Sequence, residues 1–323
     1  HPAIELLVTT SEETGMDGAV ALDPKDVKGR TLINIDSEEE GKLLVSCAGG
    51  LTARASFPLT MEATDTKMIP YLIKVRGLKG GHSGMEIDKG RGNANKLMGR
   101  ILRTLLVNTE FRLSSLSGGS KHNAIPRVAD AIILVNSDQK AMVEEKIAEC
   151  EKRFQSELRT PDPDLKLELE ELTKCPAEML SKKDTHHIVN YLYLVMNGVM
   201  SMSMDIEGLV ESSLTLGVIS MEKNTLEFVS SIRSSVKSLK EELFDRLVLI
   251  AELNGGTVVG ESNYPEWAYN PDSKIRTVFV DVYEKMFGEK PLISAIHAGL
   301  ECGLFAEKFG EIDEISFGPN LYD

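Results

Sequence analysis

The sequence predicts an α/β protein in which the first and last parts of the chain form one domain, interrupted by a long α+β insertion. Three observations support this prediction. Short apolar runs near both ends alternate with helical patterns, which is typical of a parallel sheet. Between about residues 65 and 260 the pattern changes to longer helices and alternating strands. The chain has 323 residues, more than the usual size of one domain. We therefore expect residues 1–64 and 261–323 to build one domain and residues 65–260 to build the insertion.

Acidic side chains follow two predicted strands in the first part. We expect strands at 4–9 and 31–36, with a short helix at 16–23 between them. Glu12 and Glu13 come after the first strand and Asp36 ends the second, so parallel pairing would bring them to one edge of a sheet. Carboxylates so close repel one another unless a proton or a cation separates them. A divalent metal that activates a water molecule is one solution, and a solvated loop is the alternative.

Further strands are expected at 42–46 and 51–59, joined by a turn at Cys47-Ala48-Gly49-Gly50. In the insertion, apolar periodicity predicts both helices and strands, and we expect these strands to be antiparallel. The helices are expected at 93–107, 141–154, 182–195 and 236–251, and the strands at 71–76, 111–115, 128–135, 165–169, 214–221 and 226–232. Periodicity leaves open whether the insertion is one unit or two copies of a smaller one.

Two basic side chains in the insertion are candidates for substrate binding. In Gly80-Gly81-His82-Ser83-Gly84 the glycines permit a tight turn that presents a single imidazole, which suits an oxyanion or a carboxylate. A plain strand-to-helix turn is the alternative. Arg233 lies near the end of a strand, where it either faces solvent or holds a carboxylate through two parallel hydrogen bonds.

The last part repeats the α/β pattern. We expect a loop at 261–271, a helix at 273–287, a strand at 291–296, a short helix ending at 309 and a strand at 314–317. His297 lies between the strand at 291–296 and Ala298-Gly299. Its position allows three roles, as a ligand, a substrate contact or a helix cap.

Composition narrows the choice of function. The chain carries 36 basic and 50 acidic residues, which disfavours nucleic acid or an anionic membrane as a partner. The four cysteines are far apart and form no CxxC pair, so we expect a reduced protein in the cytoplasm. No apolar run approaches the length of a membrane span, and we recognise no signal peptide. The motifs HExxH, GxSxG, GxGxxG and the P-loop do not occur.

Six stretches together resemble the M20 metallopeptidases, and among them the bacterial aminoacyl-histidine (Xaa-His) dipeptidases. They occur in the family's order along nearly the whole chain, which is far more specific than any single motif. The stretches are Thr10-Ser11-Glu12-Glu13-Thr14-Gly15-Met16, Asn34-Ile35-Asp36-Ser37-Glu38-Glu39, Cys47-Ala48-Gly49-Gly50, Gly77-Leu78-Lys79-Gly80-Gly81-His82-Ser83-Gly84, Asn123-Ala124-Ile125-Pro126-Arg127 and His297-Ala298-Gly299-Leu300-Glu301-Cys302-Gly303. The resemblance implies a zinc-peptidase-like catalytic domain interrupted by a lid domain that also forms a homodimer.

The resemblance also implies roles for individual residues. Glu12 resembles the general base that takes a proton from the attacking water. Glu13 and Asp36 resemble ligands of two separate metal ions, zinc in the first instance, with manganese or cobalt as alternatives. His82 resembles a lid histidine that reaches into the partner subunit's active site to stabilise the tetrahedral oxyanion. The remaining matched residues are the lid residues Asn123 and Arg233, which would hold substrate, and Gly299, Glu301 and His297 in the substrate-side loop, where His297 is not expected to bind metal.

The sequence departs from the family pattern at both ends. The family's His-x-Asp motif and bridging Asp should precede Glu12, and its last metal-binding histidine should follow Gly318-Pro319. We therefore expect a chain truncated at both ends, depleted of metal and inactive, derived from an active dipeptidase. Two alternatives remain open. The parent protein is another M20 hydrolase (a tripeptidase, carboxypeptidase or deacylase), or this chain serves only as a non-catalytic dimerisation module.

Overall fold

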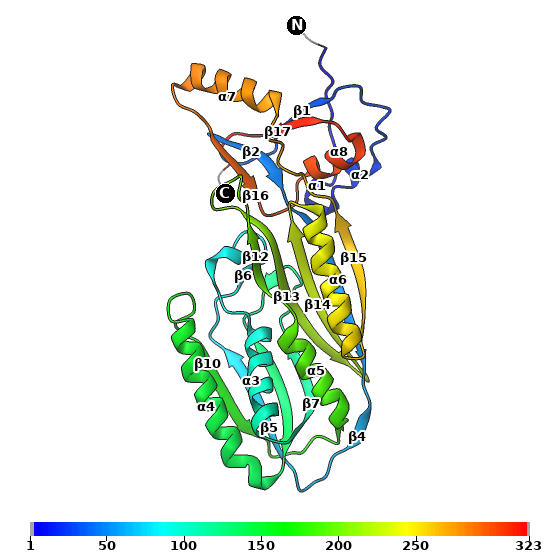
Figure 1. Ribbon diagram of the computed structural model, residues 1–323, viewed down its shortest axis with the longest axis vertical. Coiled ribbons are helices and arrows are strands. Elements are labelled where there is room, and N and C mark those ends of the chain that lie inside the picture. The colour runs from blue at the N-terminus through cyan, green and yellow to red at the C-terminus, as the bar shows by residue number, and fades with distance from the viewer. Residues whose placement is uncertain (1–2, 322–323) are drawn as a thin grey trace.

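The computed structural model describes residues 3–321, without the side chains of Glu13 and Thr14. The chain forms a small sheet of four strands and a large sheet of nine, and Figure 1 shows them at opposite ends of an elongated molecule. The strand order is β1-β17-β2-β16 in the small sheet and β10-β5-β9-β7-β13-β14-β3-β15 in the large sheet, where β12 also pairs with β13. None of the helices within residues 3–321 is long and apolar enough to cross a lipid bilayer.

Residues from both ends of the chain build the small sheet. Its strands are β1 (Thr31–Asn34), β2 (Lys42–Cys47), β16 (Leu292–Ile296) and β17 (Asp313–Ser316). β1 pairs with β17 and β2 pairs with β16, both in parallel, as expected for an α/β domain. The helices around this sheet are α1 (Glu12–Gly15), α2 (Asp17–Ala21), α7 (Lys274–Phe287) and α8 (Glu301–Phe309).

The large sheet is antiparallel at every strand pair, which confirms the pairing predicted for the insertion. Its strands are β3 (Gly49–Pro58), β5 (Ile69–Arg76), β7 (Phe111–Gly118), β9 (Ala129–Val135), β10 (Lys166–Glu171), β12 (Gly198–Met202), β13 (Val210–Glu222), β14 (Thr225–Ser234) and β15 (Thr257–Tyr264). Two short ladders complete the strands: β4 (Met61–Ala63) with β11 (Glu178–Leu180), and β6 (Gly81–His82) with β8 (Ala124–Ile125). β3 and the end of β15 pair in this sheet although they lie outside residues 65–260, and the division into domains stays a prediction.

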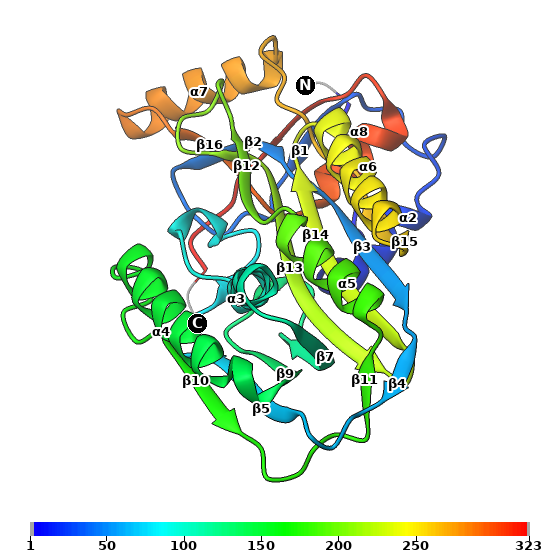
Figure 2. The ribbon, with the colours of Figure 1, turned by 60° about the horizontal axis from the view of Figure 1, so that its bottom comes forward.

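Four long helices pack on the large sheet: α3 (Ala94–Asn108), α4 (Lys140–Glu157), α5 (Lys182–Leu194) and α6 (Lys237–Leu253). Short 3-10 helices lie at Ile87–Lys89 and Ser137–Gln139. α3 begins at Asn93, whose side chain accepts a hydrogen bond from the amide of Lys96. Figure 2 shows α3, α4 and α5 on one side of the sheet.

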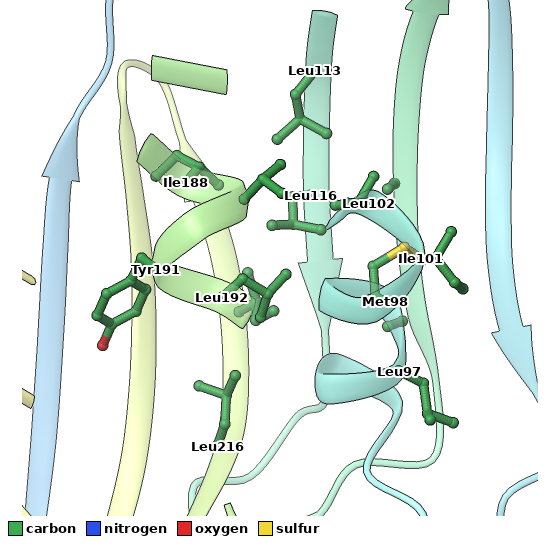
Figure 3. Close-up of a cluster of buried hydrophobic side chains, with 14 of the residues drawn as sticks. Leu97, Met98, Ile101, Leu102, Leu113, Leu116, Ile188, Tyr191, Leu192 and Leu216 are labelled. Carbon is green, nitrogen blue, oxygen red and sulfur yellow. The ribbon is translucent and has the colours of Figure 1, made fainter. Parts of the chain in front are cut away.

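The main hydrophobic core lies between these helices and the large sheet. Figure 3 shows Leu102 of α3 and Leu116 of β7 on the side toward α5, while Leu97 and Ile101 project from the side of α3 that faces away from Leu192. All five side chains belong to this core. The apolar spacing that predicted the helix at 93–107 thus corresponds to its buried face. This core fixes the strands that carry the candidate site residues.

Three sequence predictions were wrong. The turn expected at Cys47-Ala48-Gly49-Gly50 is strand except at Ala48, because the chain passes there from one sheet into the other instead of reversing within one. No strand forms at residues 4–9, although all six are described, and the side chains of Ile4, Leu6 and Val8 are exposed. A strand needs a hydrogen-bonded neighbour, and β1 pairs instead with β17. β15 extends to Tyr264, into the predicted loop at 261–271. Its sequence reads as a loop because an edge strand exposed to solvent keeps polar residues on both faces.

Candidate functional site

His82 is held in one tautomer by the turn that follows it. The backbone amides of Gly84 and Met85 donate to its Nδ1 at 3.2 and 3.0 Å. A nitrogen that accepts hydrogen bonds carries no proton, so the neutral ring carries its proton on Nε2. Burial lowers the pKa of His82, the positive charge of Arg233 lowers it further, and Glu86 opposes both. His82 is therefore a neutral imidazole with Nε2–H as a hydrogen-bond donor.

Asn123 lies beside this turn. β6 and β8 pair His82 with Ala124, and the amide of Ser83 donates to the carbonyl oxygen of Asn123 at 3.0 Å. The side chain of Asn123 is half-buried. The structure thus brings together His82 and Asn123, which the sequence predicted to contact substrate from stretches 40 residues apart.

Arg233 lies next to the same turn. It is on β14, only 7% exposed, and its Nη1 donates to the hydroxyl of Tyr264 at 2.9 Å. Its Nε is buried with no hydrogen-bond partner in the described part of the chain. A Cβ added to Gly84 would lie 3.2 Å from Arg233 Nε and 3.2 Å from His82 Cε1, and it would collide with the carbonyl oxygen of His297. Glycine at position 84 therefore allows Arg233 and His82 to approach each other.

The ring of His297 contacts a serine of the large sheet. Its Nε2 lies 2.7 Å from the hydroxyl oxygen of Ser213. Burial, together with the charge of Arg233, lowers the pKa of His297 to about 4. The ring is therefore neutral near pH 7.

Glu301 connects the substrate-side loop to the start of the chain. Its Oε2 accepts a hydrogen bond from Thr9 Oγ1 at 2.8 Å, while its Oε1 is buried without a partner among residues 3–321. Burial raises the pKa of Glu301, the bond from Thr9 opposes this, and the nearby charge of Asp36 raises the pKa further. Glu301 and Asp36 therefore lie in the same electrostatic neighbourhood.

Gly299 lies between the ring of Tyr264 and the side chain of Met16, the residue that follows α1. A Cβ on Gly299 would lie 2.8 Å from the ring of Tyr264 and 3.3 Å from the terminal methyl group of Met16. Met16 follows α1, and its amide donates to the carbonyl oxygen of Glu12 at 3.2 Å. The short helix that begins with Glu12 therefore lies against the loop of Gly299.

The predicted residues thus form two groups. One contains His82, Asn123 and Arg233, and the other contains Asp36, Gly299 and Glu301 with the helix of Glu12. The carboxylates do not meet as the ends of neighbouring strands, because residues 4–9 form no strand, and the side chain of Glu13 lies outside the described residues. Sequence reasoning missed the contacts made by Thr9, Ser213 and Tyr264. No motif marks Thr9 or Ser213, and the only signal at Tyr264 is an aromatic residue before a proline in a polar stretch.

The described side chains do not complete a metal site. Among the described side chains, which exclude that of Glu13, no three His, Cys, Asp or Glu residues converge as ligands. A bound divalent ion needs more protein ligands than Asp36 and Glu13 provide. The residues present therefore do not fit a complete metal centre.

Comparison with known proteins identifies the fold. Residues 73–162 match the model of the peptidase dimerisation domain of the M20 family. The chain is 36% identical over 322 residues to the cytosol non-specific dipeptidase of Escherichia coli (strain K12), covering 99% of this chain and 66% of that protein. The crystal structure of aminoacylhistidine dipeptidase from Vibrio alginolyticus superposes with a TM-score of 0.93 at 38% identity, covering 98% of this chain and 64% of that one.

These similarities extend over both sheets and both groups of candidate residues. The chain spans 66% and 64% of the lengths of these two relatives, so the remainder of each relative has no counterpart here. The matched part includes the dimerisation domain and the strands that surround it. The chain thus carries the peptidase dimerisation domain of the M20 family and is similar over nearly its whole length to two dipeptidases.

Proposed function

We propose that the whole protein hydrolyses dipeptides with a free N-terminus, Xaa-His dipeptides among them, in the cytoplasm and with divalent metal ions. Zinc is the proposed metal, with two ions per subunit as in two-metal peptidases, and manganese and cobalt are the alternatives. Two relatives that are dipeptidases by name, each more than a third identical to this chain, support the reaction class.

The arrangement of His82 and Arg233 is the observation that carries this proposal. A neutral N–H donor and a buried guanidinium lie side by side around Gly84. A dipeptide undergoing attack presents two matching groups, the oxyanion of its tetrahedral intermediate and its terminal carboxylate. His82 would donate from Nε2 to the oxyanion, and Arg233 would bind the carboxylate. Asn123, beside His82, would hold the peptide backbone.

Glu12 is the proposed general base. It would take a proton from the attacking water and return it to the leaving amine. Glu13 and Asp36 are the proposed metal ligands, and Gly299 and Glu301 would line the substrate side opposite the lid residues. That this chain by itself is poor in metal and inactive stays a proposal, motivated by the departures of its sequence from the family pattern. Two alternatives remain: another M20 hydrolase (a tripeptidase, carboxypeptidase or deacylase) for the whole protein, and a non-catalytic dimerisation module for this chain alone.

Substitution of the two adjacent glutamates tests the division of roles in the whole protein. Glu12→Gln should lower kcat about 10²–10⁴-fold, the range for loss of a positioned base, while metal content stays unchanged. Glu13→Gln should lower the metal content measured by elemental analysis, and excess Zn²⁺ should restore part of its activity. Glu5→Gln, on an exposed neighbouring residue, is the control. The opposite pattern would reverse the assignment, and unchanged turnover in both variants would refute the metallopeptidase mechanism.

The homodimer is proposed to form through residues 65–260, with His82 acting in the partner subunit's active site. Light scattering should give the mass of a dimer, and a monomer at high concentration would contradict the proposal for this chain. Mixing inactive His82→Ala and Glu12→Gln subunits tests the action in trans. A mixed dimer then contains one site with both residues intact, so activity should return. If His82 acts within its own subunit, the mixture stays inactive.

A further inference from the structure

We propose that Tyr264 is a positioning residue that directs the guanidinium of Arg233 toward the substrate carboxylate. Positions 50 and 299 are glycines because a side chain at either one would occupy the space of the Tyr264 ring. This inference rests on the proposed role of Arg233 in binding substrate. It assigns a role to a residue that no sequence motif marks.

Strand register places Tyr264 in line with Arg233. Ser213 of β13 pairs with Arg233 of β14, Arg233 pairs with Gly50 of β3, and Gly50 pairs with Tyr264 of β15. Directly opposed residues on neighbouring strands project from the same face of a sheet. These four residues therefore form one row across four strands, with a glycine between the tyrosine and the arginine.

The missing side chain at Gly50 lets the tyrosine reach across its strand. A Cβ on Gly50 would collide with the ring and the hydroxyl oxygen of Tyr264. The ring therefore lies over Gly50, and its hydroxyl accepts the 2.9 Å hydrogen bond from Arg233 Nη1. Gly299 lies against the same ring. A Cβ added at Gly299 would lie 2.8 Å from the ring, so a larger residue does not fit there.

The backbone of Tyr264 is also fixed. Lys240 Nζ donates to the carbonyl oxygen of Tyr264 at 2.9 Å and pairs with Glu266 at 2.8 Å, and both charged side chains are at most 10% exposed. A buried ion pair of this kind defines a geometry even where it adds little net stability. Burial raises the pKa of Tyr264, so its hydroxyl stays protonated near neutral pH.

The hydrogen bond to Tyr264 leaves the substrate-binding edge of Arg233 available. Nη1 is engaged, whereas Nε is buried, has no partner among the described residues and lies beside Gly84 in the turn of His82. A guanidinium grips a carboxylate best through two parallel N–H groups. With Nη1 tied to Tyr264, the pair formed by Nε and Nη2 is the one that remains for the carboxylate.

Binding measurements without turnover test this inference in the whole protein. In a Glu12→Gln background, calorimetry would compare an Xaa-His dipeptide with its C-terminal amide, which lacks the carboxylate. Tyr264→Phe keeps the ring and removes only the hydroxyl. It should weaken binding of the acid roughly tenfold, the effect of losing one hydrogen bond to a charged group, and leave binding of the amide unchanged. Tyr193→Phe, on an exposed tyrosine, is the matched control and should change neither.

The two substrates separate positioning from structure. Tyr264→Leu removes the ring and should weaken both ligands, as expected for a packing defect. If Tyr264→Phe weakened both ligands equally or neither, the positioning role would be overturned. If the Glu12→Gln background bound acid and amide equally, the carboxylate grip and this inference would both be wrong. If the wild-type protein hydrolysed no dipeptide, the proposed function would fail. The inference would still be supported if the acid bound more tightly than the amide and this difference depended on the hydroxyl of Tyr264.

Discussion

Helices with similar apolar patterns are buried around the large sheet, whereas α7 beside the small sheet is not. Around the large sheet, the apolar faces of α3 and α5 are buried in one continuous core. In the small-sheet region, α7 has an equally regular apolar pattern, yet none of its residues is buried. Val278, Val282, Met286 and Phe287 are all exposed. Periodicity therefore predicts that a helix forms, whereas burial depends on what packs against it.

The two regions also hold their candidate site residues differently. The large sheet supplies His82 and Arg233, each fixed by hydrogen bonds to neighbouring groups. The small-sheet region supplies Glu12, which is half-buried, and Asp36, which is exposed. The two residues proposed to orient substrate are thus held by hydrogen bonds in the large-sheet region, while the candidate carboxylates lie in the small-sheet region.

Paired truncations provide the strongest test of this contrast. Leu102→Ala removes a side chain from the centre of the main core and should lower the free energy of unfolding by about 2–5 kcal/mol. Val282→Ala, on the exposed face of α7, should change it by less than about 0.5 kcal/mol. Denaturant titration of both variants measures the difference. Equal losses would show that α7 is packed in solution.

Glu314 on β17 should make the small-sheet region sensitive to pH. Burial raises its pKa from 4.5 to about 8, and the charge of Asp313 acts in the same direction. Between these values the folded protein binds a proton that the unfolded chain releases, so stability falls as pH rises through this window. Glu314→Gln should raise the free energy of unfolding by about 4 kcal/mol near pH 8 and have little effect near pH 4.

Denaturation curves of wild type and Glu314→Gln across this pH range measure the effect. Glu307→Gln, on the neighbouring helix α8, is the control. Parallel curves for wild type and Glu314→Gln would mean that the buried carboxyl group is solvated or paired in solution.

The cap of α7 should have the smallest effect. Ser273 accepts a hydrogen bond from the amide of Arg276 and donates one to Asp313 at 2.6 Å, so α7 is tied to β17 by polar contacts. Ser273→Ala should destabilise the protein by about 1 kcal/mol, and Ser273→Asn, which can still cap the helix, by less. Thermal unfolding followed by circular dichroism distinguishes them. Equal losses in the two variants would show that the contact with Asp313, rather than the cap, is what matters.

Local patterns in the sequence predicted much of the fold. The helices at 93–107 and 182–195 and the antiparallel pairing of the insertion were confirmed. The strand at 4–9 was wrong because its apolar residues have no hydrogen-bonded neighbour. The sequence could not predict which residues pair across the strands, because the paired residues are far apart in the chain. The row formed by Ser213, Arg233, Gly50 and Tyr264 is an example.

The same limit applies to the candidate site. The glycine-rich turn identified His82 from local sequence, but its tautomer depends on two backbone amides whose direction only the folded turn defines. The local signal at Tyr264, an aromatic residue before a proline, does not point to Arg233. Its contact with Arg233 depends on the empty position at Gly50, on the strand between them. The roles assigned from the family resemblance stay predictions.

The junction between the two sheets has a consequence for motion. The chain passes from the small sheet to the large one at Ala48, between β2 and β3, and returns after β15. Cys47 and Trp267 exchange two backbone hydrogen bonds, of 3.0 and 3.1 Å, which hold the two crossings side by side. Two adjacent chain crossings are where a hinge between the sheets would lie. Gly50 and Tyr264 each lie three residues from the Cys47–Trp267 pair, so a rotation at this junction would act first on the tyrosine that holds Arg233.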